Sequence, residues 1–482
     1  MKLRAVLRVL GFLLGVTAAG MLLPAAVSAL YHDGDAHAFL LAALVGAAAG
    51  GGLWLAGADA RGIRVREGFA VVSLGWLAVG LLGGVPAWFS GQIPSYTDAA
   101  FESISGFTTT GATILTDIEG RSHGLLFWRA LTHWMGGMGI VLLALAILPL
   151  LGVGGMQLFR AEVPGPVAER LTPRISQTAK LLWGVYVLLT VLETGALAIA
   201  GMSVFDAVCH AMATMATGGF STRDASVGAY ASASIDWIVT VFMFLAGTNF
   251  TLHYLALTGR VRAYWQDDEF RFYLTVLGLA TALVVIPLLA VGYYPDLLAT
   301  LRYGLFQTVS IMTTTGFGTA DYLLWPPVAH ALLLSLMVVG GCAGSTGGGI
   351  KVMRLLLLTK VAKLELQKLV HPRAVTTLWF NGRSVSTSLA HNVLGFFLLY
   401  VLVFVAGMVI LTLGGRDLTT AIGATAATLG NIGPGLGEVG PASNYAHLLG
   451  WEKWLLSFMM ITGRLEIYTV LVLLLPEAWR RT

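Results

Sequence analysis

Residues 98–113 read DAAFESISGFTTTGAT, and residues 206–221 read DAVCHAMATMATGGFS. Both stretches begin with an Asp-Ala pair, continue as a short apolar helix and reach a glycine at the same distance from the Asp. Two later stretches end in a similar way, with MTTTGFGTADY at residues 312–322 and TLGNIGPGLG at residues 428–437. The alignment therefore indicates an internal repeat, in which a glycine recurs about every hundred residues: Gly111, Gly219, Gly316 and Gly433.

Long apolar runs flank each of these short stretches. Ten runs are long enough to span a bilayer, which takes about 20 residues of helix: 5–30, 37–57, 67–90, 124–151, 177–201, 234–258, 271–293, 328–357, 386–414 and 449–475. The four short stretches each lie between two full spans and are too short to cross: 96–113, 204–221, 299–318 and 417–435. Four copies of one unit predict a pseudo-fourfold axis, which is a natural place for a pore.

The predicted fold class is therefore an all-α integral membrane protein. It has four tandem helix–pore-loop–helix repeats around a pseudo-fourfold pore, preceded by two transmembrane helices. We expect the two N-terminal helices in residues 1–60 and the four repeats in residues 61–160, 161–262, 263–370 and 371–482.

Composition and charge placement agree with a membrane protein. The chain is 56% hydrophobic and only 11% charged, too few charges for a soluble protein of this length. Lys and Arg precede the first span and gather in alternate connectors, and this pattern predicts that both termini lie in the cytoplasm. The richest basic connector, 354–383, could instead be a local partner-binding surface. No nucleic-acid partner is expected.

The short stretches carry the chemistry of a cation path. A pore helix that ends near mid-membrane directs its partial negative charge toward a cation. The backbone carbonyls of the following segment can replace the hydration shell of an alkali ion. Glycine permits the backbone angles that this requires. Close helix packing is the alternative role for such glycines, but four matched positions favour the pore.

A second repeated feature lies further along each unit, where small residues interrupt the inner helix: Gly137, Gly247, Gly344 and Gly463. The third interruption, GGCAGSTGGGIK at residues 340–351, is too rich in glycine for a regular helix. We expect it to form a loop within the membrane that obstructs the pore, and a simple kink is the alternative. The fourth interruption is followed by Arg464, whose charge at that depth is costly and predicts a role in gating. The alternative is a structural Arg paired with backbone carbonyls.

These motifs together resemble the Trk/Ktr/HKT superfamily of potassium transporters, and most of all the bacterial Trk membrane subunit. The resemblance rests on nearly the whole chain: SGFTTTGAT, ATGGFST, TTTGFGTADY, GNIGPGLG, HWMGGMGIVLLALAILP, GGCAGSTGGGIKVMR and TGRLEIYTV. It implies potassium uptake across the bacterial cytoplasmic (inner) membrane through a gated, potential-driven selective pore.

The resemblance also implies specific residues. The selectivity filter would comprise Thr109, Thr110, Gly111, Thr217, Gly218, Gly219, Thr314, Thr315, Gly316, Asn431, Ile432 and Gly433. Potassium would be held by the backbone carbonyls of Thr110, Gly111, Gly218, Gly219, Thr315, Gly316, Ile432 and Gly433. The gate would comprise Gly344, Ser345, Thr346, Gly347, Gly348, Gly349 and Arg464. Because the four loops differ in sequence, passage of rubidium or sodium stays open.

Partners and rival functions complete the expectations. The resemblance implies a homodimer and a cytoplasmic ring of nucleotide-binding regulatory subunits, with membrane lipid around the chain. Potassium is the substrate, and no organic cofactor is expected. An enzyme is not expected, because the spans contain no nucleophile–base or metal cluster. Two alternatives stay open: a proton- or sodium-coupled potassium symporter, which Glu193 and Glu466 would suit, and the potassium-binding subunit of an ATP-driven pump.

Overall fold

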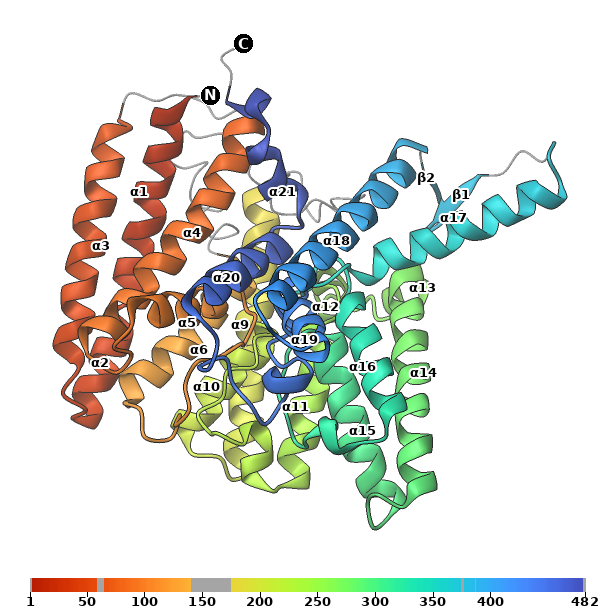
Figure 1. Ribbon diagram of the computed structural model, residues 1–482, viewed down its shortest axis with the longest axis horizontal. Coiled ribbons are helices and arrows are strands. Elements are labelled where there is room, and N and C mark those ends of the chain that lie inside the picture. The colour runs from red at the N-terminus through yellow and green to blue at the C-terminus, as the bar shows by residue number, and fades with distance from the viewer. Residues whose placement is uncertain (1, 59–64, 140–174, 374–376, 386, 480–482) are drawn as a thin grey trace.

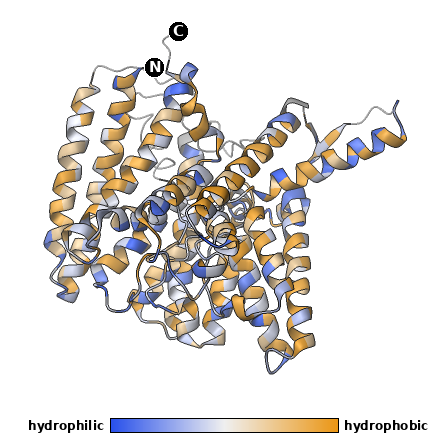
Figure 2. Ribbon diagram, viewed as in Figure 1, coloured by the Kyte–Doolittle hydropathy of each residue, from blue (hydrophilic) through white to orange (hydrophobic). Residues whose placement is uncertain are grey.

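The computed structural model describes residues 2–58, 65–139, 175–373, 377–385 and 387–479. Within these residues the protein is helical except for one short β-hairpin, and the helices stand side by side as a bundle (Figure 1). Apolar residues cover the lengths of the peripheral helices, and polar residues gather at their ends and around the centre (Figure 2). The predicted all-α membrane architecture is confirmed.

Six helices of the described residues are long and apolar enough to span a membrane, and two bent helix pairs raise that number to eight. The first span is formed by α1 (Leu3–Gly20) and α2 (Leu22–Tyr31), which join at Met21. It packs against α3 (Ala36–Ala56). The two helices touch at Gly11 and Gly50, where a Cβ on either residue would meet the other's carbonyl oxygen. Two spanning helices thus precede the first repeat.

Each of the four repeats begins with a long outer helix and continues with a short pore helix. The outer helices are α4 (Val65–Phe89), α9 (Ile175–Ile199), α14 (Asp268–Val291) and α18 (Thr387–Leu413). The pore helices are α5 (Tyr96–Phe107), α10 (Val204–Met215), α15 (Leu297–Met312) and α19 (Leu418–Leu429). All four pore helices begin at a side-chain cap that accepts the N–H three residues on: Ser95, Ser203, Asp296 and Asp417.

The Asp417 cap lies on an exposed turn. Hydrogen bonds from the Thr420 side chain and backbone hold the pKa of the Asp417 carboxyl below its ordinary value. A depressed carboxyl pKa means that the charged form is stabilised by folding, so this contribution is lost as the pH falls through the lowered pKa.

The inner helices all break where the sequence predicts. They are α6 (His123–Gly137), α11 (Ala233–Ala246), α16 (Pro327–Val339) and α20 (Gly450–Arg464). After the break, α12 (Phe250–Leu257) turns by 101° from α11, and α21 (Tyr468–Leu471) with the following turn bends by 112° from α20. The predicted spans 234–258, 328–357 and 449–475 therefore consist of broken helices, as the small residues within them indicate. The predicted segment 140–151 of the fourth span lies outside the described residues.

The third repeat departs most from a straight helix. The chain leaves α16 at Gly340 and does not resume a helix until α17 (Val352–Val370). We call Gly340–Lys351 the intramembrane loop. Four of its residues have a left-handed backbone, which explains why glycine dominates it: Gly340, Gly344, Gly349 and Lys351.

The connector between the third and fourth repeats contains α17 and a two-stranded antiparallel hairpin. Its strands β1 (Leu378–Phe380) and β2 (Arg383–Val385) pair Leu378 with Val385 and Phe380 with Arg383. Figure 1 shows α17 extending away from the bundle. The remaining short elements are α13 (Ala263–Gln266) and the 3₁₀ turns Ser226–Tyr230, Tyr322–Leu324, Gly437–Val439, Val472–Leu474 and Pro476–Ala478.

Glycines at the inner-helix breaks allow contact with the pore helices. A Cβ on Gly136 would overlap the carbonyl oxygen of Phe107, the last residue of α5. We expect Gly136→Ala to destabilise the fold by about 1–3 kcal/mol, because the backbone must separate to make room. Gly184→Ala in α9 is the matched control, since nothing lies within 4 Å of its added Cβ. Thermal unfolding of the detergent-solubilised protein measures both, and equal midpoints for the two variants would contradict the prediction.

Candidate functional site

Four glycine loops follow the four pore helices and turn in the same way. We define the glycine loops as residues 108–113, 216–221, 313–318 and 430–435. Each has a left-handed residue two positions before its glycine and a left-handed glycine. The φ values are 53° and 81° at Thr109 and Gly111, 53° and 77° at Thr217 and Gly219, 62° and 82° at Thr314 and Gly316, and 55° and 96° at Asn431 and Gly433. Residues with positive φ thus alternate with other residues along each loop. This alternation gives neighbouring carbonyls directions that a regular helix or strand does not provide.

One hydrogen bond sets this turn in every repeat. The N–H of the residue before the glycine donates to the carbonyl five residues earlier in the pore helix, at 2.8 Å in all four cases. The donor–acceptor pairs are Thr110–Ser105, Gly218–Ala213, Thr315–Ser310 and Ile432–Ala427. Because the donor is a backbone group, threonine, glycine and isoleucine at this position give one geometry.

The four glycine loops meet one another in a closed ring. A Cβ added to Gly111 would overlap the Gly218 carbonyl oxygen, and one on Gly219 would overlap that of Thr315. One on Gly316 would overlap that of Ile432, and one on Gly433 would lie 2.8 Å from that of Thr110. The order of contacts therefore runs through repeats one, two, three and four and returns to one. All the predicted filter glycines come together, and each lies against a carbonyl of the predicted ligand set.

Side chains behind the ring differ between the repeats. Glu102, His210 and Gln307 occupy matched places on α5, α10 and α15 and form hydrogen bonds there. His210 lies 2.9 Å from the Ser221 hydroxyl, and Gln307 donates to the Ala320 carbonyl at 3.2 Å. In the fourth repeat a tyrosine supplies the hydrogen bond behind the ring: the Tyr445 hydroxyl donates to the Gly433 carbonyl at 2.7 Å.

The first repeat has a buried ion pair at this place. The Arg129 Nε donates to the Glu102 carboxylate at 2.8 Å, and both side chains are 4% exposed. Arg129 also donates to the Ser221 carbonyl at 3.1 Å, and Glu102 accepts the Thr113 hydroxyl at 2.8 Å. One ion pair thus connects the first and second glycine loops. The sequence analysis did not single out Arg129, although a charged residue inside an apolar span is a recognisable indication.

The intramembrane loop lies directly beneath the ring. Its Gly348 N–H donates to the hydroxyl of Thr314 at 2.7 Å, so the loop contacts the third glycine loop. Its Thr346 hydroxyl donates to the Met215 and Ala246 carbonyls at 3.0 and 3.2 Å, where α10 and α11 end. A Cβ on Gly348 would overlap the Gly430 carbonyl oxygen, which places the loop against the fourth repeat too.

Arg464 extends from the end of α20 across this space. Its guanidinium donates to the Thr346 carbonyl at 2.7 Å and to the Gly136 and Gly137 carbonyls at 2.8 and 2.9 Å. Arg464 thus donates to backbone carbonyls, the arrangement that the sequence analysis gave as the alternative to a role in gating. Glu466, two residues further along the chain, pairs with Arg354. The cation nevertheless joins the intramembrane loop to the end of α6.

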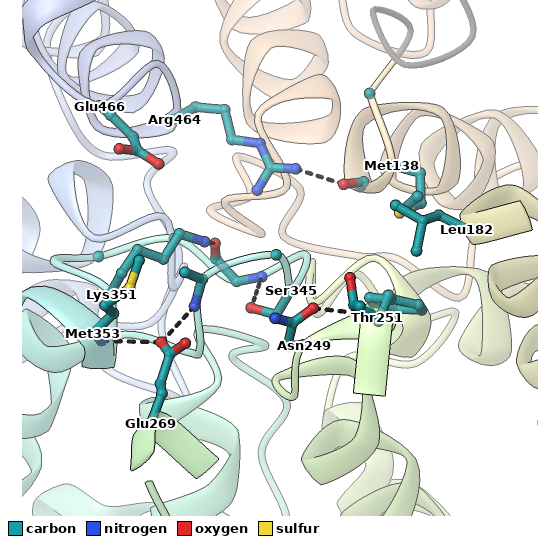
Figure 3. A pocket seen from close by; sticks show the side chains of 18 of the residues that line it. Met138, Leu182, Asn249, Thr251, Glu269, Ser345, Lys351, Met353, Arg464 and Glu466 are labelled. Carbon is teal, nitrogen blue, oxygen red and sulfur yellow. Dashed lines mark hydrogen bonds between the residues drawn. The ribbon is translucent and has the colours of Figure 1, made fainter. Parts of the chain in front are cut away.

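A cavity opens on the other side of the intramembrane loop. It has a volume of ≈ 200 Å³, and its lining includes Arg464, Glu466, Lys351, Glu269 and Asn249. Figure 3 shows Arg464 and Glu269 on opposite sides of the chain segment that carries Ser345 and Lys351. All the predicted gate residues are therefore gathered between the ring and this cavity. Glu269 was missed by the sequence analysis, and its position in the acidic run before an apolar span was the available indication.

The fold and the site define a multi-pass membrane protein with four pore-loop repeats around a single ring of backbone carbonyls. The TrkH family model, described as a cation transport protein, matches residues 36–479. The chain therefore belongs to the TrkH family of cation transport proteins, a family of transporters and not of enzymes.

Relatives match over their whole length. The chain is 45% identical to the Trk system potassium uptake proteins TrkH of Salmonella typhimurium and Escherichia coli K12, covering 100% of both chains in each case. The crystal structure of the potassium transporter TrkH from Vibrio parahaemolyticus has a TM-score of 0.89 and 42% identity, again with 100% of each chain covered.

The buried pair behind the ring generates a stability prediction. Glu102→Ala would leave Arg129 charged and buried without its carboxylate, which costs about 3–5 kcal/mol. Glu119→Ala is the control, because its pair with Arg223 is between side chains 47% and 39% exposed and contributes about 1 kcal/mol or less. Unfolding midpoints of the two purified variants measure the difference. The prediction is wrong if both variants unfold at the same midpoint.

Proposed function

We propose that this chain takes up potassium through the ring of glycine loops, driven by the membrane potential and gated by the intramembrane loop and Arg464. The observation that carries the proposal is the closed ring of carbonyl oxygens. Carbonyls around a single axis can replace the hydration shell of an alkali cation without any formal charge. The names of the full-length relatives, which describe potassium uptake and transport, support potassium as the substrate.

The proposed ion ligands are the carbonyls on and just before each glycine: Thr110, Gly111, Gly218, Gly219, Thr315, Gly316, Ile432 and Gly433. The left-handed residues Thr109, Thr217, Thr314 and Asn431 would form the lower edge of the filter. Support comes from the common backbone turn and from the way each glycine lies against a neighbouring repeat's carbonyl. A side chain at any of the four glycines would enter that ring.

The proposed closed gate consists of residues 344–349 and Arg464. The loop occupies the space below the ring, and Arg464 adds a positive charge beside the path. At an effective dielectric of about 20, a unit charge about 6 Å from a cation adds roughly 3 kcal/mol to its energy. Conduction would require the loop to move and Arg464 to leave the path. A potential of 100 mV supplies about 2.3 kcal/mol per charge for uptake.

Orientation and partners are also proposals. The start of α1 and the turn Pro476–Ala478 lie at the same end of the bundle (Figure 1), and the basic connectors support placing that end in the cytoplasm of a bacterial inner membrane. The relatives are named as proteins of a Trk system, and a system of several components supports a cytoplasmic regulatory subunit that binds this chain. The resemblance to the bacterial Trk membrane subunit implies that the regulatory subunits form a nucleotide-binding ring and that this chain forms a homodimer.

Selectivity is tested at Gly316. We expect Gly316→Ser to lower the preference for potassium over sodium by about tenfold, equivalent to about 1.4 kcal/mol, because its side chain would displace the Ile432 carbonyl. The control is Gly318→Ser, two residues on, where the nearest atoms lie 3.9–4.0 Å from an added Cβ. Rubidium-86 and sodium-22 uptake into proteoliposomes under a set diffusion potential measures the preference. Unchanged selectivity in Gly316→Ser would show that the ring is not the filter.

Gating is tested at Arg464. We expect Arg464→Ala to raise potassium flux at least about tenfold, because it removes a barrier of more than 1.4 kcal/mol and a bond to the intramembrane loop. Arg260→Ala, an exposed cation beyond α12, is the control and should leave flux unchanged. Flux in the wild type that requires a proton or sodium gradient, or an ATPase partner, would favour the symporter or the pump subunit over the gated pore.

A further inference from the structure

The start of α14 carries three consecutive acidic residues, Asp267, Asp268 and Glu269, for which the proposed pore has no use. Asp267 caps the helix by accepting the Phe270 N–H at 2.7 Å. Asp268 and Glu269 begin a span that crosses the membrane on the outside of the third repeat. Acidic residues suit a helix N-terminus, and one carboxylate is enough to cap it. Capping therefore does not explain why Glu269 is buried, with only 3% of its surface exposed.

Glu269 holds both ends of the intramembrane loop. Its Oε1 accepts the Ala343 N–H at 2.7 Å and the Met353 N–H at 3.0 Å. Ala343 lies near the beginning of the loop, and Met353 lies in the first turn of α17 just after its end. A single buried oxygen thus holds Ala343 and Met353 together, and the chain between these two residues extends beneath the ring. Figure 3 shows Glu269 pointing at this base.

Backbone hydrogen bonds also hold the ends of the loop, among them the bond from the Val352 N–H to the Gly341 carbonyl at 2.9 Å. The contacts near the middle of the loop have different partners. Thr346 and Gly348 bond to the ends of α10 and α11 and to Thr314, and Arg464 bonds to the Thr346 carbonyl. These are the contacts that opening must break. The Glu269 contacts can persist while the middle of the loop moves, so they fix the base about which the movement occurs.

Asp267 and Asp268 are held from the other side by the hairpin. The Asn381 amide donates to the Asp267 carboxylate at 2.8 Å, and its oxygen accepts the Asp268 N–H at 2.7 Å. The Asn381 N–H donates to the Asp268 carboxylate at 3.1 Å, and Lys360 of α17 donates to the same oxygen at 3.0 Å. Three adjacent residues therefore bind the hairpin, α17 and the base of the loop.

We propose that Asp267, Asp268 and Glu269 form a connector through which the hairpin Leu378–Val385 sets the position of the base of the intramembrane loop. Glu269 is the positioning residue for the loop, and Asn381 positions the start of α14. A partner or a charge change at the hairpin can then act on the gate without touching the pore. The inference rests on the proposed gate, since it assigns a route of regulation to that loop.

The two cysteines of the chain provide a direct measurement. Cys342 precedes Ala343 and is 1% exposed, and Cys209 in α10 is equally buried. In full-length Cys209→Ser protein, the rate at which a maleimide labels Cys342 reports opening of the loop base. We expect Glu269→Ala to raise this rate about tenfold, the change that losing one or two hydrogen bonds produces. Glu269→Gln removes the same charge but keeps an acceptor oxygen, so it should label more slowly than Glu269→Ala.

The hairpin half of the connector is tested at Asn381. Asn381 has a left-handed backbone, so Asn381→Gly removes the amide without adding strain. We expect this variant to raise Cys342 labelling above the wild-type rate, although Asn381 does not contact the loop. Glu365→Gln is the control, because Glu365 is an exposed residue of α17 that pairs only locally with Lys368. Equal labelling of Glu269→Ala and Glu269→Gln, or wild-type labelling of Asn381→Gly, overturns the proposal.

Hydrogen exchange of the wild-type protein gives a measurement that needs no variant to fold. The amides of Ala343 and Met353 should exchange as slowly as those inside α14 if Glu269 clamps them, and fast exchange at both sites overturns the clamp. Labelling and exchange do not depend on ion flux. Unchanged selectivity in Gly316→Ser would therefore contradict the pore. If Arg464→Ala raises flux as expected but the base of the loop proves unclamped, only the connector is contradicted.

Discussion

Carbonyl oxygens that face one another around an axis repel unless a cation lies between them or the backbone is held from behind. In this protein the chain is held from behind by the same backbone hydrogen bond in all four repeats, from the residue before the glycine to the carbonyl five residues earlier. The acceptor of this bond is a carbonyl of the pore helix, so the pore helix must end next to the glycine loop. The pore helix in turn is stabilised by its N-terminal cap and by the two longer helices that flank it in the repeat. The architecture of each repeat follows from this requirement.

The same constraint explains where glycine is indispensable. At Gly111, Gly219, Gly316 and Gly433 the backbone is left-handed, and a neighbouring repeat's carbonyl occupies the place of a side chain. At Gly136 and Gly463 the reason is different, because the inner helix passes against the end of a pore helix. One residue type thus serves ring closure in the first case and helix contact in the second.

The four repeats share a backbone but not their surroundings. A buried ion pair contacts the first glycine loop, a histidine the second and a tyrosine hydroxyl the fourth, whereas a glutamine bonds to Ala320 just beyond the third. Below the ring, within the part of the chain that the structure describes, the third repeat contributes the intramembrane loop and the fourth contributes Arg464. In the proposed mechanism, gating therefore depends on the differences between the repeats, whereas ion coordination depends on the backbone that they share.

Local sequence patterns are enough to predict the membrane class, the four repeats, the glycines of the ring and the four interruptions of the inner helices. These follow from periodicity and from local backbone chemistry, which operate within one repeat. Tertiary structure decided the order in which the loops meet, the pairing of Glu102 with Arg129, and the choice of backbone carbonyls over Glu466 as partners of Arg464. It also decided that Glu269 would bond to Ala343 and Met353. Such contacts join residues far apart in the chain, and no local pattern of residue types encodes which distant group a side chain will reach.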